Sequence, residues 1–89
     1  MIMRTLTIRN SRGLHARAAA QFVQTAEKFD AEIEVSKDGQ TVTGTSIMGL
    51  MMLAAAKGTS IDVRAAGPEA EAALAEIVAL VEAGFHEEN

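Results

Sequence analysis

Residues 31–45, AEIEVSKDGQTVTGT, contain the pattern that decides the fold. In the first half of this stretch every second residue is apolar, as in a strand with one buried face: Ala31, Ile33 and Val35. Asp38-Gly39 then stands where a tight turn would connect this strand to a second one over residues 40–45. The stretch therefore predicts a β-hairpin in the middle of the chain.

The residues before this hairpin predict one strand and one helix. Residues 1–9 alternate apolar and polar side chains, with Arg4 as a break in the pattern. Residues 10–13 are typical of a turn, and after them the hydrophobic period changes to about 3.6 residues. This period predicts a helix over residues 16–28 with one buried stripe: Ala19, Phe22, Val23, Ala26 and Phe29.

The residues after the hairpin predict a helix, a strand and a last helix. Ser46 precedes an apolar run and is a favoured N-cap, because its hydroxyl accepts from a backbone N–H that has no other partner. Gly58 is the expected end of this helix. Residues 61–65 alternate as a strand, and Pro68 marks the first turn of a helix that ends near Gly84.

The predicted element order is therefore βαββαβα. This order favours an α+β fold, an open-faced sandwich in which a four-stranded, mostly antiparallel sheet has three helices on one face. The chain has 89 residues, of which 48% are hydrophobic, enough for a small core. We expect residues 1–89 to form a single domain.

Charge and composition argue against several classes of partner. Eight Lys and Arg against twelve Asp and Glu give a net charge of -4, and Trp and Tyr are absent, so we expect no nucleic-acid binding. The chain has no Cys and two His without clustered carboxylates, so we expect neither a metal site nor a cofactor. The apolar run 47–56 is too short for membrane insertion, and with no secretory signal evident we expect a cytoplasmic protein.

His15 is the first candidate for chemistry. It stands at a predicted loop-to-helix junction, where unpaired backbone N–H groups and the helix dipole favour an anion. Arg17 adds a guanidinium that matches phosphate oxygens, and a neutral imidazole is a nucleophile toward phosphorus. The pattern is consistent with a phosphohistidine at His15, or with a histidine that only caps the helix.

Ser46 and the apolar run after it form the second candidate. A helix this apolar cannot bury every side chain in so small a domain, so we expect Leu50 and Leu53 in the core and a docking surface elsewhere. A buried helix with Met as filler is the alternative. Phosphorylation of Ser46 would add about −2 charges beside the surface. The expected docking residues are Leu14, Ile47, Met48, Met51 and Met52.

The residues after Gly84 have no sequence pattern that indicates a functional site. His86 has no Arg or helix start beside it, so we expect it to be solvated. The tail over residues 85–89 is acidic, and we expect it to fray.

Both motifs together resemble the HPr family, the histidine phosphocarrier proteins of the bacterial phosphoenolpyruvate-dependent phosphotransferase system. Gly13-Leu14-His15-Ala16-Arg17 is similar to the active-site segment of the family, and Ser46-Ile47-Met48-Gly49-Leu50-Met51 is similar to its regulatory-serine segment. The resemblance spans nearly the whole chain, and it implies the same open-faced sandwich.

The resemblance implies the chemistry of His15. Nδ1 of His15 would take a phosphoryl group from the phosphohistidine of enzyme I and pass it to a histidine of an enzyme IIA-type protein. Arg17 and the backbone amides of Ala16 and Arg17 would hold the phosphoryl oxygens, and Ser46 would be the target of an HPr kinase/phosphorylase. Such a protein carries a phosphoryl group rather than acting as a stand-alone catalyst.

One residue departs from the family pattern. The family commonly has Pro where this chain has Ala18, a position early in the helix where Pro is tolerated. This difference favours the nitrogen-related or regulatory branch over the sugar-uptake branch.

A second function fits the same motifs. The domain would then be a regulatory binding module, in which phosphorylation of His15 and Ser46 signals to target proteins instead of supplying a group for transfer. In either case we expect a monomer, because a protein that meets successive partners through one surface needs that surface free.

Overall fold

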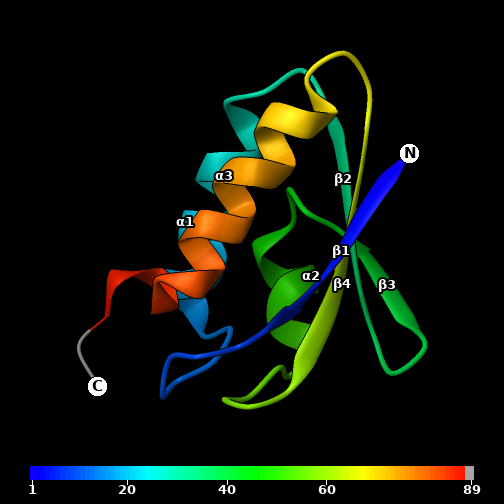
Figure 1. Cartoon of the computed structure of the whole chain (residues 1–89). Coiled ribbons are helices and arrows are strands. Elements are labelled where there is room, and N and C mark those ends of the chain that lie inside the picture. Colours follow the sequence, from blue (N-terminus) through cyan, green and yellow to red (C-terminus); the bar gives the residue numbers. More distant parts are fainter. Residues whose placement is uncertain (88–89) are drawn as a thin grey trace.

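The computed structural model describes residues 1–87 and contains the predicted order of elements (Figure 1). Most of these elements are somewhat shorter than their sequence patterns, whereas β4 extends one residue beyond its predicted strand at each end, and a short 3-10 turn follows the last helix. The elements are β1 (Ile2–Thr7), α1 (Ala16–Glu27), β2 (Glu32–Lys37), β3 (Gln40–Thr43), α2 (Ile47–Met52), β4 (Ser60–Ala66), α3 (Ala70–Glu82) and η1 (Gly84–His86).

The strands form one sheet in the order β1-β4-β2-β3, and every neighbouring pair is antiparallel. Leu6 lies opposite Ile61, and Val63 lies opposite Val35, so the apolar residues of successive strands share one face. α1 and α3 pack against each other on that face (Figure 1). The open-faced sandwich predicted from the sequence is confirmed.

The central hairpin turns where the sequence predicts. Asp38 and Gly39 both have positive φ, 51° and 83°, and Lys37 pairs with Gln40 on either side of them. Two consecutive residues with positive φ give the turn a twist that matches that of the strands. The Asp-Gly pair therefore sets the register of β2 against β3.

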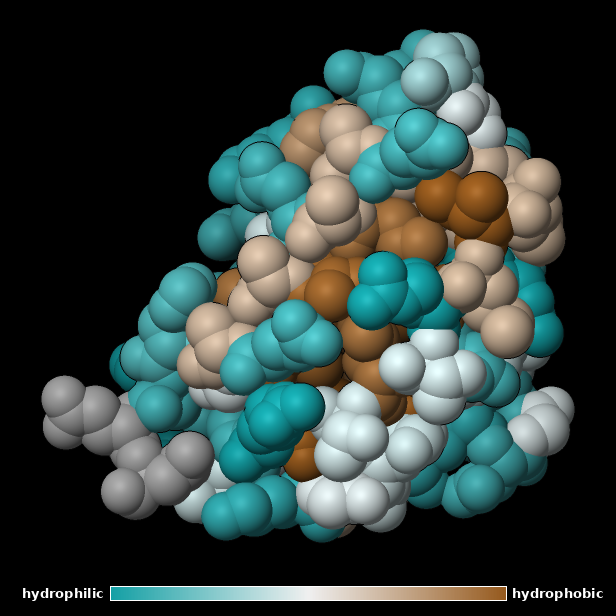
Figure 2. Space-filling model, in the orientation of Figure 1, coloured by the Kyte–Doolittle hydropathy of each residue, from teal (hydrophilic) through white to brown (hydrophobic). Residues whose placement is uncertain are grey.

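The core lies between the sheet and the helices. The stripe predicted for α1 is buried, apart from Phe29, which packs against the core from its edge. Arg4 pairs with Val63 and so lies on the same face as Leu6, but β1 is an edge strand and Arg4 is exposed. Figure 2 shows apolar residues gathered along the surface between α3 and β1.

Two helix boundaries differ from the prediction. α2 ends at Met52 instead of Gly58, because Ala54 adopts a left-handed φ of 52° that stops the helix. α3 begins at Ala70, so Pro68 precedes the helix instead of standing in its first turn. The backbone of Glu69 is held by Asp30: its N–H donates to the Asp30 carbonyl at 3.0 Å.

The predicted fraying of the tail is wrong for residues 85–87. Gly84, with a φ of 64°, turns the chain back toward the core, and Phe85 is buried there with 1% of its surface exposed. Residues 88–89, the rest of that predicted tail, lie outside the described residues. None of the helices within residues 1–87 has the length and apolar character required to span a bilayer.

The close packing of Gly13 against Ala55 can be tested by comparison with Gly39. Both have positive φ, but a Cβ at Gly13 would lie 2.2 Å from the carbonyl oxygen of Ala55, whereas a Cβ at Gly39 would meet nothing within 4 Å. We expect Gly39→Ala to lower the free energy of unfolding by about 1 kcal/mol and Gly13→Ala by about 3 kcal/mol. Urea unfolding measures both, and equal losses would contradict the close approach at Gly13.

Candidate functional site

The loop before α1 is held in one conformation by its own polar groups. Asn10 is completely buried, and its Nδ2 donates to the Gly13 carbonyl at 2.8 Å. The Gly13 N–H donates to the Asn10 carbonyl at 3.1 Å, and the Leu14 N–H donates to the Ala55 carbonyl at 2.9 Å. These hydrogen bonds fix the position of the backbone where α1 begins.

His15 is the N-cap residue of α1, but its side chain does not cap the helix. Its backbone is extended, with φ −74° and ψ 178°, and its imidazole makes no capping hydrogen bond. Its carbonyl accepts from the N–H of Ala19 at 2.8 Å. The amides of Ala16 and Arg17 lie in the first turn, where a helix offers no acceptor of its own. The His15 ring therefore lies at the start of α1 but forms no hydrogen bond with the amides of its first turn.

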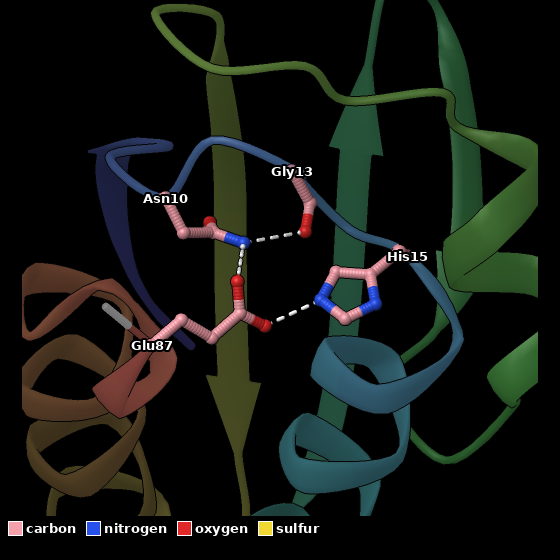
Figure 3. A network of polar contacts seen from close by, with 4 residues as sticks. All are labelled: Asn10, Gly13, His15 and Glu87. Carbon is pink, nitrogen blue, oxygen red and sulfur yellow. Dashed lines mark hydrogen bonds and ion pairs between the residues drawn. The ribbon is translucent and has the colours of Figure 1, made fainter. Parts of the chain in front are cut away.

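The ring of His15 is instead bound by the tail. Its Nε2 contacts Oε2 of Glu87, and Oε1 of Glu87 accepts from Asn10 Nδ2 at 3.0 Å (Figure 3). The side chain of His15 is 23% exposed and that of Glu87 is 14% exposed. In Figure 3, Nδ1 lies on the side of the ring away from the carboxylate. Residues far apart in the chain thus fix the orientation of the imidazole.

Glu87 is ionised over a wide pH range in this setting. Burial raises its pKa, but hydrogen bonds from His15 and Asn10 lower it, and the positive charges of His15 and Arg12 lower it further. The result is a pKa below the ordinary value of 4.5. The carboxylate is therefore an anion at neutral pH, directly beside the ring.

A surface hollow of about 360 Å³ lies beside His15 and Glu87. Arg17 lines it together with His15, as expected from their spacing. His86 is exposed as expected, but it also lines the hollow, which its position in the sequence does not indicate. Within residues 1–87 the lining is Ser11, Arg12, His15, Arg17, Gln21, Phe85, His86 and Glu87.

Three residues of the site, Asn10, Arg12 and Glu87, are not indicated by the sequence pattern. Asn10 falls in the predicted turn, and its buried amide is a feature of the folded loop. Glu87 falls in the predicted frayed tail, and only the left-handed backbone at residues 84–86 brings it to His15. The acidic run after Phe85 is the one available signal, and it indicates no partner by itself.

The groups that line the hollow are suited to a phosphoryl group. Guanidinium groups and helix amides are the usual partners of phosphate oxygens. Over residues 1–87, no three His, Cys, Asp or Glu side chains are grouped so that they could hold a metal ion.

α2 presents the expected apolar surface. The side chains of Met48 and Met52 are 68% and 69% exposed, whereas Leu50 and Leu53 are buried. Ile47 and Met51 are also exposed, at 40% and 39%. The helix is therefore not the fully buried one considered as an alternative, and its Met side chains are available to a partner.

Ser46 and Leu14 are the other two predicted residues of this region. Ser46 caps α2, and its Oγ accepts from the Gly49 N–H at 2.9 Å. Leu14, expected to contact a partner, is buried with 5% exposure, so that part of the prediction is wrong. Its side chain packs in the core because its backbone is bound to Ala55, just after α2.

This combination of fold and site also occurs in known proteins. Residues 2–83 match the family model described as PTS HPr component phosphorylation site. The chain belongs to the HPr family. Its match to this family covers every strand and all three α-helices.

Members of the HPr family resemble the chain over its whole length. It is 45% identical over 87 residues to phosphocarrier protein HPr of Neisseria meningitidis, with 98% of both chains covered. It is 40% identical over 88 residues to phosphocarrier protein NPr of Escherichia coli K12, again with 98% of both covered. The crystal structure of an HPr from Thermoanaerobacter tengcongensis superposes with a TM-score of 0.95 at 45% identity, with both chains fully covered.

The lowered pKa of Glu87 predicts how stability depends on pH. Because the folded state binds the proton of Glu87 less tightly than the unfolded chain does, the carboxylate stabilises the fold above about pH 4.5, and this stabilisation is lost as the pH falls through the lowered pKa. We expect Glu87→Gln to be less stable than the unsubstituted protein at pH 7, with the difference shrinking as the pH falls below about 4.5. Urea unfolding at several pH values measures it. If the difference in the free energy of unfolding does not change with pH, the shape of the Glu87 side chain and not its charge is responsible.

Proposed function

We propose that the protein is a phosphocarrier in which His15 is the phosphorylated residue. It would accept a phosphoryl group, derived from phosphoenolpyruvate, from a phosphohistidine of enzyme I and pass it to a histidine of an enzyme IIA-type protein. The observation that carries this proposal is the placement of the His15 ring: Glu87 holds Nε2, and Nδ1 faces away from that carboxylate beside a helix start. Membership of the HPr family supports it.

The surroundings of His15 suit transient storage of a phosphoryl group. Arg17 lines the hollow, and its guanidinium would pair with phosphoryl oxygens, while the amides of Ala16 and Arg17 would donate to them. The imidazole is only half-buried, so the group would stay in reach of a second protein. A carrier needs this balance, because transfer must be close to isoenergetic in both directions.

Successive partners would dock on the exposed side chains of α2. This helix packs against α1, and the segment after it binds the backbone of Leu14, so the apolar surface and His15 are neighbours. Flexible Met side chains adapt to partners of different shape. The proposed docking residues are Ile47, Met48, Met51 and Met52.

The proposal also includes the branch of the HPr family, the number of domains, the oligomeric state and the location in the cell. Ala18 is fully buried, and its presence where Pro is usual favours a nitrogen-related or regulatory carrier. Relatives called HPr and relatives called NPr are similar to the chain at 45% and 40% identity, so both branches are represented. We propose that residues 1–89 act as one domain, as a monomer, in the cytoplasm.

The alternative is a regulatory module in which phosphorylation is only a signal. It shares the exposed α2 surface, and the onward fate of the phosphoryl group distinguishes the two. In a carrier the group on His15 leaves when an enzyme IIA-type protein is added, whereas in a signalling module it stays.

Phosphorylation by enzyme I is the direct test. We expect phosphoenolpyruvate with a trace of enzyme I to add one phosphoryl group, visible by intact mass and lost in acid. His15→Ala should show no adduct, and Arg17→Ala should slow its formation about tenfold, since a hydrogen bond to a charged group contributes about 1.5–3 kcal/mol. Absence of an adduct with an active enzyme I would overturn the proposal.

Ser46 is proposed as a regulatory phosphorylation site, with an HPr kinase/phosphorylase as the enzyme. Its hydroxyl caps α2 directly before the exposed Ile47 and Met48. A phosphate there would place about −2 charges at the edge of the docking surface, where they would be costly to desolvate in an interface and would repel an acidic partner.

Ser46→Asp isolates this effect of charge. Asp is as good an N-cap as Ser, so the variant should keep α2 and gain a negative charge. We expect its phosphorylation by enzyme I to slow about tenfold or more, measured as the initial rate of adduct formation. Ala72→Asp adds the same charge at an exposed position of α3 and should leave the rate unchanged. An unchanged rate in Ser46→Asp would refute the regulatory role.

A further inference from the structure

Glu87 is an unexpected group in a site for phosphate. Among the described residues that line the hollow around His15, Glu87 alone carries a carboxylate, and an anion repels the phosphoryl group that the site would hold. Yet this carboxylate is bound at both oxygens, to His15 Nε2 and to the buried amide of Asn10. An anion held so firmly beside a nucleophile needs a role that offsets the repulsion.

We propose that Glu87 is a positioning residue for phosphoryl transfer at His15. Its carboxylate keeps a proton on Nε2 and fixes the plane of the ring, so that Nδ1 presents its lone pair to the incoming phosphorus. The carboxylate that orients the histidine of a catalytic triad acts in the same way. This inference rests on the proposed function, since it concerns the same ring.

The transfer step itself makes the charge of Glu87 useful. The Nδ1 lone pair forms a P–N bond while the P–N bond of the donor breaks, and that electron pair returns to the ring nitrogen of the donor. The proton on Nε2 stays in place, so the His15 ring gains a formal positive charge, which the adjacent carboxylate offsets. Glu87 therefore stabilises the phosphorylated ring and shifts the equilibrium toward it.

Asn10 makes the arrangement stable against the mobility expected of a chain end. Its Nδ2 bridges the Gly13 carbonyl and Glu87, and Phe85 anchors the same segment in the core with 1% exposure. The carboxylate is thus attached to the loop that carries His15. It is directed at Nε2, on the opposite side of the ring from Nδ1 (Figure 3).

Two variants separate the charge of Glu87 from its hydrogen bond. Glu87→Gln keeps an oxygen that accepts the Nε2 proton but has no charge, and Glu87→Ala removes both. Glu34→Gln is the matched control, because Glu34 is exposed on β2 and does not line the hollow. Each full-length variant is compared with the unsubstituted protein by circular dichroism before use.

The readouts are the rate and the equilibrium of phosphorylation by enzyme I. We expect Glu87→Ala to react about tenfold more slowly and to hold a smaller phosphorylated fraction at equilibrium, with Glu87→Gln between it and the control. In nitrogen-15 spectra of the ring, the Nε2 proton should exchange slowly with water in the unsubstituted protein and rapidly in Glu87→Ala. A residue with a purely structural role would leave the equilibrium unchanged.

The outcomes are distinct from those of the proposed function. If the unsubstituted protein is phosphorylated and both Glu87 variants match it in rate and equilibrium within about twofold, the positioning role is wrong and the carrier function stands. If the unsubstituted protein takes no phosphoryl group from active enzyme I, the proposed function fails and this role fails with it. The nitrogen-15 spectra then still decide whether Glu87 holds the Nε2 proton.

Discussion

The close approach of Gly13 to Ala55 is the constraint on which the site depends. A side chain at Gly13 would collide with the Ala55 carbonyl, and that same carbonyl accepts the N–H of Leu14. This contact joins the loop before α1 to the segment after α2, so it brings the start of α1, at His15, close to the end of α2. The early end of α2 at Met52 follows from the same arrangement, since the chain must leave the helix to present Ala55.

The second feature of the site is a local charge pattern that opposes the charge of the whole chain. The net charge is -4, yet the guanidinium groups of Arg12 and Arg17 line one hollow with His15. Glu87 lies within this cluster, with a pKa held below its ordinary value by its hydrogen bonds and the adjacent positive charges. A small acidic protein can thus present a locally positive hollow without attracting polyanions in general.

Much of the fold was predictable because it depends on local rules. The period-two alternation around Ile33 and Val35, the Asp38-Gly39 turn and the Ser46 cap each act within a few residues, and the structure confirms all of them. The errors lie where distant segments interact. The sequence predicts Leu14 as a docking residue and a frayed tail from Phe85, but Leu14 lies in the core and the tail is packed over residues 85–87.

The sequence by itself determined the element order, the position of His15 at the start of a helix and the surplus of apolar residues on α2. These follow from periodicity, capping and composition, which are local properties of the chain. Only the tertiary structure decided which way the imidazole faces, because Asn10 and Glu87 are separated by 77 residues and meet only after Gly84 turns the chain back. A left-handed residue at a chain end has no periodic pattern to reveal it, and its consequence depends on where the rest of the fold has placed His15.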